Sequence, residues 1–430
     1  MVSGSPETAS IDTTPATPQR RRGRPQLGAP ASFWTAAGVV VVALWASGSP
    51  ALIYPLYEQA WALSAAVITA IFSVYPVVLV VVLLIFGSLS DYIGRRATIL
   101  AGLASILIGV LTFALAPSVE WLFVGRVFQG LGVGLALSPA GAALYEFDRP
   151  GKRASSVNTI AIAVGLSIAT IVGGALVQYA PWPRELTFWL LLAVAVVLIA
   201  IAFFLPAHVR GAESQGRWRP RPIHVPRDLR PMVITSALAI TATFGIGAVF
   251  ISLGAQIVKD VLHTDNALIA GLVLAIGSAG AGVVSVLFNR MPARMSIVIG
   301  GLVSAGSAAL LVTSASLSSL PLFIAASLVF GLSSGLLFLG GFGLVNQNAP
   351  AHHRAGTIAV VYLVAYVGQG VTAIGLGLLA TSISLRGGLD IVVPLLVLLS
   401  LATSLVASLV GRPRPTQSTP TSPTRAVTVD

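Results

Sequence analysis

The sequence predicts an all-α polytopic membrane protein whose twelve transmembrane helices form two pseudo-symmetric six-helix bundles. Three observations lead to this fold class. Only 9% of the 430 residues are charged and 56% are hydrophobic, whereas a soluble domain is about 25% charged. The hydrophobic residues gather in twelve stretches, each near the roughly 20 residues that cross a bilayer. The two halves of the chain also share residues at corresponding positions.

The twelve predicted spans follow one another with polar loops between them. The first is longer than the apolar core of a cleaved signal peptide, about 7–15 residues, and a second span follows at once. We interpret Arg20-Arg21-Arg22 before it as a cytosolic anchor rather than a twin-arginine signal. The spans are 33–57, 64–87, 97–116, 120–145, 154–179, 186–206, 232–257, 266–288, 296–315, 321–345, 355–380 and 389–411.

The basic residues predict the orientation, because Lys and Arg collect in cytosolic loops. With the N-terminus inside, the outer loops hold Arg184, Lys259 and Arg386, and Arg126 lies within a span. The other 21 of the 25 Lys and Arg residues then face the cytosol. Both termini are therefore expected there. The net charge of +11 lies in short loops and does not indicate nucleic-acid binding. Arginine-rich, lysine-poor composition favours a bacterial inner (plasma) membrane.

Polar segments divide the chain into five parts. Residues 1–31 and 412–430 are rich in Ser, Thr, Pro and Arg, and we expect disordered cytosolic tails. The polar stretch 207–231 is predicted to be a cytosolic linker. It separates an N-terminal bundle over 32–206 from a C-terminal bundle over 232–411.

The two bundles share residues at near-constant offsets. Arg96 corresponds to Arg294 at an offset of 198, and Gly130 corresponds to Gly331 at an offset of 201. The matching positions lie at matching places in the topology. Parallel repeats of this kind are typical of membrane transporters.

The stretch GSLSDYIGRR at 87–96 resembles the helix 2–3 signature of the major facilitator superfamily, G-x-L-[AS]-D-x-x-G-R-[RK]. The resemblance covers about residues 33–411. It implies transport by alternating access, with this turn as part of a cytoplasmic latch. Asp91 would accept hydrogen bonds at the N-terminus of helix 11, where the helix dipole favours an anion. The other residues of this predicted turn are Gly87, Gly94, Arg95 and Arg96.

The segment EFDRPGKR after the fourth span resembles the E-x6-R element of sugar porters and related members. Glu146 begins the element and Arg153 ends it. We expect Glu146 to pair with Arg95 or Arg96. A solvated loop with ordinary surface charges is the alternative interpretation.

Arg126 is the basic residue that the topology places inside a span, where insertion costs at least about 2.5–3.5 kcal/mol. With Gly130 it resembles the family's helix-4 signature R-x-x-x-G, which implies proton coupling or substrate binding. Gln129 lies on nearly the same helix face. The alternative is a mainly structural arginine, only about 9 Å deep, whose side chain extends outward.

Small residues in the fourth and fifth spans are expected to pack helices closely. The fifth span carries GLSIATIVGG, which keeps three glycines of the drug–proton antiporter signature G-x-x-x-G-P-x-x-G-G but replaces its Gly-Pro by Ala169-Thr170. This departure weakens the antiporter assignment, and helix packing explains the glycines equally well. The packing glycines are Gly130, Gly134, Gly165, Gly173 and Gly174.

In the family, helices 1, 4, 7 and 10 line the central path. Tyr54 in the first span is a candidate lining residue, and Tyr362, Tyr366 and Gln369 share one face of the eleventh. The mostly apolar lining indicates an amphipathic or hydrophobic substrate, although aromatic residues also collect at membrane interfaces. Further candidates are Trp45, Tyr57, Tyr75, Phe244, Gln256 and Asn346.

We therefore expect a secondary active transporter that exports small organic or drug-like compounds by proton coupling, with proton-coupled uptake of a sugar or organic acid as the alternative. The chain has no cysteine and no P-loop, so no cofactor, metal site or enzyme activity is expected. No acid lies deep in a span, which leaves Glu58, Asp91 and Glu146 as possible proton carriers. The expected partners are the lipid bilayer, a small-molecule substrate and the proton, with the protein as a monomer.

Overall fold

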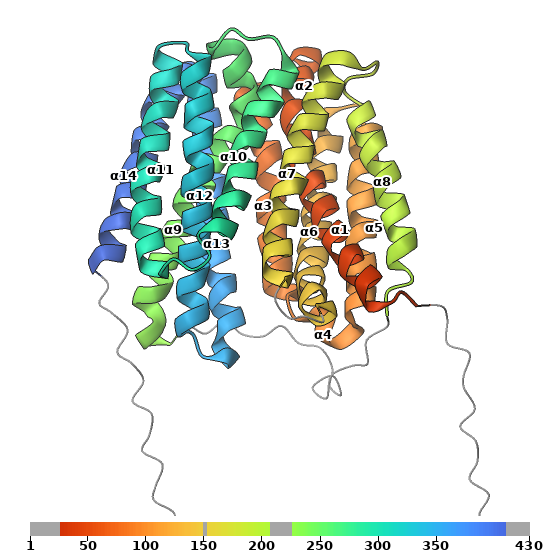
Figure 1. Ribbon diagram of the computed structural model, residues 1–430. Coiled ribbons are helices and arrows are strands. Elements are labelled where there is room, and N and C mark those ends of the chain that lie inside the picture. Colours follow the sequence, from red (N-terminus) through yellow and green to blue (C-terminus); the bar gives the residue numbers. More distant parts are fainter. Residues whose placement is uncertain (1–25, 149–152, 207–225, 410–430) are drawn as a thin grey trace, which may run out of the picture.

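The structure, a computed structural model, describes residues 26–148, 153–206 and 226–409. All regular elements in these ranges are helices (Figure 1). Eleven helical segments are long and apolar enough to cross a membrane, and α8 (Leu186–Ala202) is a shorter apolar helix of 17 residues. The predicted all-α fold is confirmed, and α8 lies within the predicted span 186–206.

The first half of the described chain contains eight α-helices and a short 3₁₀ helix, η1. Their bounds are α1 Ala29–Gly48, η1 Ser49–Leu52, α2 Tyr54–Trp61, α3 Ala65–Phe86, α4 Leu89–Ile93, α5 Arg95–Ala114, α6 Val119–Phe147, α7 Ala154–Tyr179 and α8 Leu186–Ala202. The second half has the same succession of six long helices. Their bounds, with two short elements, are η3 Arg227–Leu229, α9 Arg230–Gln256, η4 Ile257–Val261, α10 Ala267–Leu287, α11 Ala293–Ser316, α12 Leu320–Asn348, α13 Ala351–Ser382 and α14 Leu385–Leu409.

The first predicted span is interrupted. The helix expected over 33–57 ends at Gly48, continues as η1 and resumes as α2. Pro50 lacks the N–H that would bond the carbonyl of Ala46, and the Ser49 hydroxyl donates to that carbonyl instead, at 3.0 Å. The interruption places Tyr54 at the start of a separate short helix.

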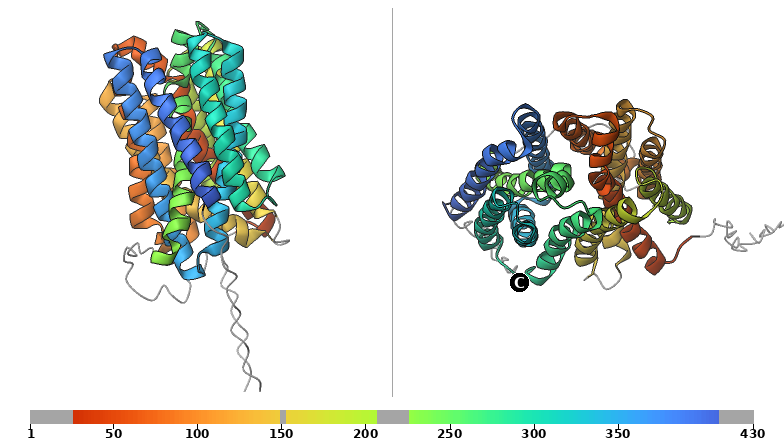
Figure 2. Two further views of the ribbon diagram at one scale, coloured as in Figure 1. Left: turned by 90° about the vertical axis from the view of Figure 1, so that its left-hand side faces the viewer. Right: turned by 90° about the horizontal axis from the view of Figure 1, so that it is seen from above.

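The helices form two groups that meet along α3, α7, α10 and α13. Viewed from above, α1–α8 lie on one side and α9–α14 on the other (Figure 2), with α3 packed against α13 and α7 against α10. We call the end that carries α2, at the top of Figure 1, the α2 end. The opposite end, which carries α4, is the α4 end.

An arginine at the same place in each half bonds the end of that half's last helix. Arg96, in the first turn of α5, donates to the carbonyl of Leu205 at 3.3 Å, and its guanidinium lies 5.5 Å from the ring centre of Phe203. Arg294, in the first turn of α11, donates to the carbonyl of Ala407 at 2.8 Å. Carbonyls at helix C-termini lack intrahelical partners and favour cations. Arg96 therefore bonds the chain three residues beyond the end of α8 at Ala202, whereas the sequence suggested that it pairs with an acid.

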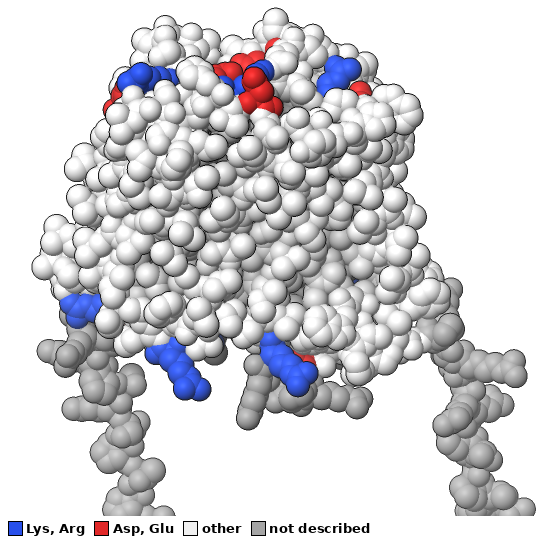
Figure 3. All heavy atoms as spheres, turned by 45° about the horizontal axis from the view of Figure 1, so that its top comes forward, with Lys and Arg blue, Asp and Glu red and all other residues white. Residues whose placement is uncertain are grey.

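The outer surface has the charge distribution of a membrane protein. Figure 3 shows a broad band without charged residues between the Lys, Arg, Asp and Glu side chains at the two ends. Large apolar side chains are exposed within the spans, among them Val197, Val371 and Leu398. An apolar belt of this kind is stable in lipid and unstable in water.

Candidate functional site

Arg126 is the centre of a buried polar cluster in the first half. Its side chain is fully enclosed, with 0% exposure. Nε donates to the hydroxyl of Tyr54 at 3.0 Å, and Nη2 donates to the same hydroxyl. Nη1 donates to the carbonyl of Ser47 at 2.8 Å and to Oε1 of Gln129 at 3.0 Å. The side chain therefore does not extend outward to the membrane surface.

The interruption after α1 builds this cluster. Because α1 ends at Gly48, the carbonyl of Ser47 belongs to a last turn whose carbonyls lack intrahelical partners. Arg126 on α6 bonds that carbonyl, and the restart of the chain at α2 brings Tyr54 to the guanidinium. The sequence predicted Arg126, Gln129 and Tyr54 as candidates, and the structure brings all three together.

Arg126 has no counter-ion in the described chain. The salt bridges there join Arg95 to Glu146 and Arg184 to Glu185, so no described carboxylate lies within 4.0 Å of Arg126. Aromatic faces surround it instead. The centroids of the Tyr54, Phe72 and Tyr75 rings lie 5.6, 5.9 and 5.6 Å from its guanidinium carbon. Cation–π attraction and hydrogen bonds hold this charge, which stays uncompensated.

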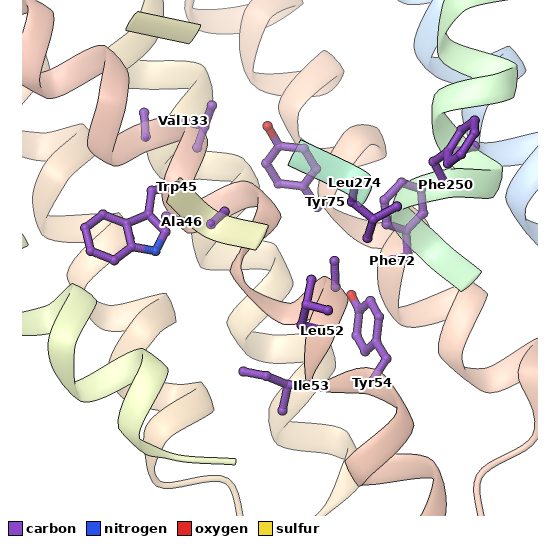
Figure 4. Close-up of a cluster of buried hydrophobic side chains, with 14 of the residues drawn as sticks. Trp45, Ala46, Leu52, Ile53, Tyr54, Phe72, Tyr75, Val133, Phe250 and Leu274 are labelled. Atoms are coloured by element: carbon purple, nitrogen blue, oxygen red, sulfur yellow. The ribbon is translucent and has the colours of Figure 1, made fainter. Parts of the chain in front are cut away.

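Figure 4 shows how the aromatic side chains around this cluster lie. Tyr54, Phe72 and Tyr75 lie on one side of α1, whereas the indole of Trp45 points away from Tyr75. Trp45 is buried, and its Nε1 has no hydrogen-bond partner in the part of the chain that the structure describes. Phe72 of the first half and Phe250 of the second half belong to the same hydrophobic core cluster, which therefore extends across both halves. Trp45, a candidate lining residue by sequence, thus packs within the first half.

The second half contributes a closed circuit of five aromatic rings, which we call the aromatic cluster. Its members are partly exposed and come from α9, α12 and α13. The pairs and their centroid distances are Phe244–Phe338 5.7 Å, Phe338–Phe342 5.9 Å, Phe342–Tyr362 4.8 Å, Tyr362–Tyr366 5.9 Å and Tyr366–Phe244 4.7 Å.

The aromatic cluster contains three predicted residues and two that sequence reasoning missed. Tyr362 and Tyr366 stack on one face of α13, as their spacing predicted. Phe338 and Phe342 were missed, although their four-residue separation puts them on one face of α12. Gln369, one turn further along α13, is buried, and its Oε1 has no hydrogen-bond partner within the described ranges.

The aromatic cluster faces the Arg126 cluster where α3 meets α13. Tyr366 of the aromatic cluster is on α13 and Tyr75 is on α3, and these two helices pack against each other. Tyr75 in turn lies against Arg126. The two halves thus present a guanidinium with aromatic neighbours on one side and stacked rings on the other.

The two halves are joined at the α2 end. Three hydrogen bonds between described residues cross between the halves here: from the Ala66 N–H to Thr381 Oγ1 at 3.0 Å, from the Ala267 N–H to Gln178 Oε1 at 2.8 Å, and from Gln256 Nε2 to Glu58 Oε2 at 2.5 Å. Helices of the two halves also cross closely at the α2 end. A Cβ atom added to Gly174 of α7 would lie 2.5 Å from the carbonyl oxygen of Ala267 of α10, and a Cβ atom added to Gly377 of α13 would overlap Thr69 of α3.

The other predicted packing glycines differ in how tightly they pack. An added Cβ would lie 2.7 Å from the Tyr75 carbonyl oxygen at Gly130, 2.7 Å from Val82 Cγ1 at Gly134 and 2.5 Å from the Val41 carbonyl oxygen at Gly165. At Gly173 the nearest atom, Leu52 Cβ, is 3.6 Å away, an ordinary contact. Four of the five glycines, Gly174 included, therefore lie where helices approach too closely for a side chain.

The 87–96 turn contains the short helix α4, which the sequence did not predict. Gly94 ends it with φ 89°, a conformation that favours glycine. Arg95 pairs with Glu146 and also donates to the carbonyl of Ala142 at 3.2 Å. Gly87 directly follows α3. The side chain of Asp91 lies outside the described part of the structure, so its role in a latch stays a prediction.

The turn before α7 depends on an acid that sequence reasoning missed. The carboxylate of Asp148 accepts hydrogen bonds from the backbone N–H groups of Arg153 and Ala154, at 2.6 and 2.9 Å. A carboxylate at a helix N-terminus is stabilised by the helix dipole. Arg153 therefore contributes its backbone to this turn.

Comparison with known proteins defines the class to which this fold and site belong. The family model described as Major Facilitator Superfamily matches residues 33–355 and 238–428. The chain belongs to this superfamily. Its relatives and its fold are those of membrane transporters, not enzymes.

The names of individual relatives refer to different transported compounds. The Tetracenomycin C resistance and export protein of Streptomyces glaucescens is 31% identical over 211 residues, 48% of this chain and 38% of that protein. The chain thus spans less than half the length of this relative. The Probable 4-methylmuconolactone transporter of Cupriavidus pinatubonensis is 24% identical over 70% of this chain and 72% of that protein. A crystal structure of a bacterial homolog to the human lysosomal transporter Spinster, inward-facing and unoccupied, superposes with a TM-score of 0.68 at 16% identity, covering 88% of this chain and 97% of that one.

Proposed function

We propose that the protein is a proton-coupled secondary transporter that exports small aromatic or amphipathic organic compounds by alternating access. The observation that carries the proposal is the pairing of the Arg126 cluster with the aromatic cluster across the two halves. Two bundles that face each other around such side chains form a transport site in this architecture. The relative named as an export protein supports the direction.

The charges of the site favour neutral or anionic compounds over cations. Arg126 is buried without a counter-ion among the described residues. A cation about 7 Å from it would be repelled by about 2 kcal/mol at an effective dielectric constant of about 20. Attraction to a partly exposed aromatic face offsets only about 0.5–1 kcal/mol. An aromatic compound without positive charge avoids this repulsion and stacks on the same rings.

In this proposal the α2 end faces the outside of a bacterial plasma membrane, because most Lys and Arg residues belong to the segments at the other end. The bonds and close helix crossings at the α2 end make the described state closed to the outside. Export requires the α2 end to open from this state.

Uptake of an organic acid is the second candidate function. Among the relatives described above, the 4-methylmuconolactone transporter aligns over the larger share of both chains. A buried guanidinium suits a carboxylate as well as it suits a neutral aromatic compound. Export and uptake therefore share one site and differ in the direction of net transport.

Everted membrane vesicles test these proposals. Vesicles with the protein, energised by respiration, are supplied with one anionic, one neutral and one cationic aromatic fluorophore. We expect the anionic or neutral probe to accumulate, and a protonophore to abolish the accumulation. Arg126→Met should lose accumulation, whereas Arg386→Met, which changes an exposed arginine at the α2 end, should retain it. Accumulation of the cation alone would contradict the substrate class, and accumulation only in right-side-out vesicles would favour uptake.

A further inference from the structure

A cavity at the α2 end lies between the two halves. Its volume is about 290 Å³. Glu58 from α2 and Gln256 and Asp260 from the second half supply its two carboxyl groups and its amide group. The remaining lining residues are Ser64, Ala65, Leu253, Ala380, Thr381 and Leu385. No carboxylate other than Glu58 and Asp260 lines this cavity, so two acids from opposite halves meet in it.

Glu58 is the acid that depends on contact between the halves. It is partly buried and accepts a hydrogen bond from Gln256 Nε2 at 2.5 Å. Burial raises the pKa of the Glu58 carboxyl, and the charge of Asp260 raises it further, whereas the bond from Gln256 and the charge of Lys259 lower it. The groups that α3, α13 and α14 present to the cavity are uncharged. The net effect is a raised pKa.

Gln256 provides a second, independent observation. It is 2% exposed, and its Oε1 has no hydrogen-bond partner among the described residues. A buried carbonyl oxygen without a donor is destabilising. A protonated Glu58 could donate to this amide oxygen only if the amide group turned over, and the turn would leave Nε2 in the unpartnered position instead. What Gln256 adds is geometric: a buried side chain of the second half bonds Glu58, and this bond exists only while the α2 end is closed.

We propose that Glu58 is a proton-binding residue that takes up a proton from the outer solution as the α2 end closes and returns it to the same solution as that end opens, so that it sets the pH dependence of closure and is not itself the proton carrier across the membrane. The inference rests on the proposed alternation between states. In the closed state Glu58 and Gln256 are in contact. When the halves separate, Glu58 becomes solvated and loses both the burial and the neighbouring Asp260. The proton adds to a carboxylate oxygen, and no other bond forms or breaks.

The sign of the pH dependence follows from this cycle. The closed state binds the proton more tightly, so low pH favours closure and rising pH favours opening. Each unit of difference in the pKa of Glu58 between the two states changes the closed-to-open ratio about tenfold. The pH-dependent change from the closed to the open state should lie above the usual pKa range of a glutamate. Neutralising Glu58 should remove this pH dependence.

A distance measurement tests the proposal without a substrate. The chain has no cysteine, so spin labels can be attached to cysteines introduced at Ala60 and Ser382, which are exposed at the α2 end on opposite halves. Distance distributions are recorded in lipid nanodiscs from acidic to mildly alkaline pH. We expect the longer distance to gain population as pH rises. Glu58→Gln should hold the short distance at every pH.

Two further variants make the test selective. Glu120→Gln neutralises an exposed acid at the N-terminus of α6, away from the cavity, and should keep the wild-type pH profile. Asp260→Asn removes a charge that raises the pKa of Glu58, and should move the transition to lower pH. This variant keeps the test decisive if Glu58→Gln does not fold.

A profile that Glu58→Gln leaves unchanged, or a distance independent of pH in the wild type, would overturn the role of Glu58. Protonophore-sensitive transport in vesicles would then still support the proposed function. Conversely, the distance could depend on pH in the wild type but not in Glu58→Gln, while the protonophore leaves transport unchanged. This pair of results would support Glu58 as a proton-binding residue and refute coupling of transport to a proton gradient. The two failures are therefore distinguishable.

Discussion

Replacing Tyr54 by phenylalanine removes one oxygen atom from the Arg126 cluster and leaves the ring. That oxygen accepts from both Nε and Nη2 of the guanidinium. A hydrogen bond to a charged group contributes about 1.5–3 kcal/mol. Loss of two such bonds inside a site with 0% exposure gives an expected destabilisation of about 3–6 kcal/mol. The cation–π contact, 5.6 Å from guanidinium carbon to ring centre, is retained.

Tyr57→Phe is the matched control on the same short helix. Tyr57 is also buried, and its hydroxyl donates to the neutral carbonyl of Phe113 at 3.4 Å. A neutral bond contributes about 0.5–1.5 kcal/mol, so this variant should be the milder by about 2 kcal/mol or more. Equilibrium unfolding in mixed detergent micelles, followed by tryptophan fluorescence, measures both free energies. Equal destabilisation by the two variants would refute the reasoning that the Tyr54 hydroxyl stabilises the buried guanidinium of Arg126.

Three further perturbations have contrasting expected outcomes. Glu146→Gln should lower the unfolding free energy by less than about 1 kcal/mol, because its partly exposed pair with Arg95 is screened by solvent; a larger loss in thermal unfolding would contradict this. Gly377→Ala should shift spin-label distances at the α2 end toward separation, because its Cβ overlaps Thr69, whereas Gly375→Ala, with open space around it, should leave them unchanged. Arg96→Met and Arg294→Met should each speed amide hydrogen exchange at the end of α8 and of α14 respectively, and exchange unchanged in both would argue against the helix-end bonds.

The sequence predicted the helices more completely than their contacts. Twelve spans were predictable because a bilayer imposes the length of each apolar stretch. The interruption at Ser49–Leu52 was missed, although Pro50 and Pro55 indicate it. The whole stretch is apolar and long enough for one span, so its composition does not show that one helix ends and another begins. The short helix α4 was missed because a glycine-bounded turn of five residues carries no periodicity.

The candidate site was predicted in part. Arg126 was identified by its charge, and Gln129 by its position on the same helix face. The carbonyl of Ser47 was not predictable, since any backbone carbonyl looks alike in a sequence. The contact between Glu58 and Gln256 joins residues 198 apart, and only the way the two halves meet determines it. Phe338 and Phe342 were missed because, in an apolar membrane helix, a phenylalanine that contributes to a site does not differ in polarity from its neighbours.

The bonds from Arg96 and Arg294 have a mechanical consequence. Each bond connects the third membrane span of a half to the end of its sixth span. Each half therefore resists bending at the α4 end and rotates as a rigid body. A span of about 25 residues is about 38 Å long. A rotation of about 15° around its midpoint then moves its tip by about 5 Å, enough to break every hydrogen bond across the opposite end.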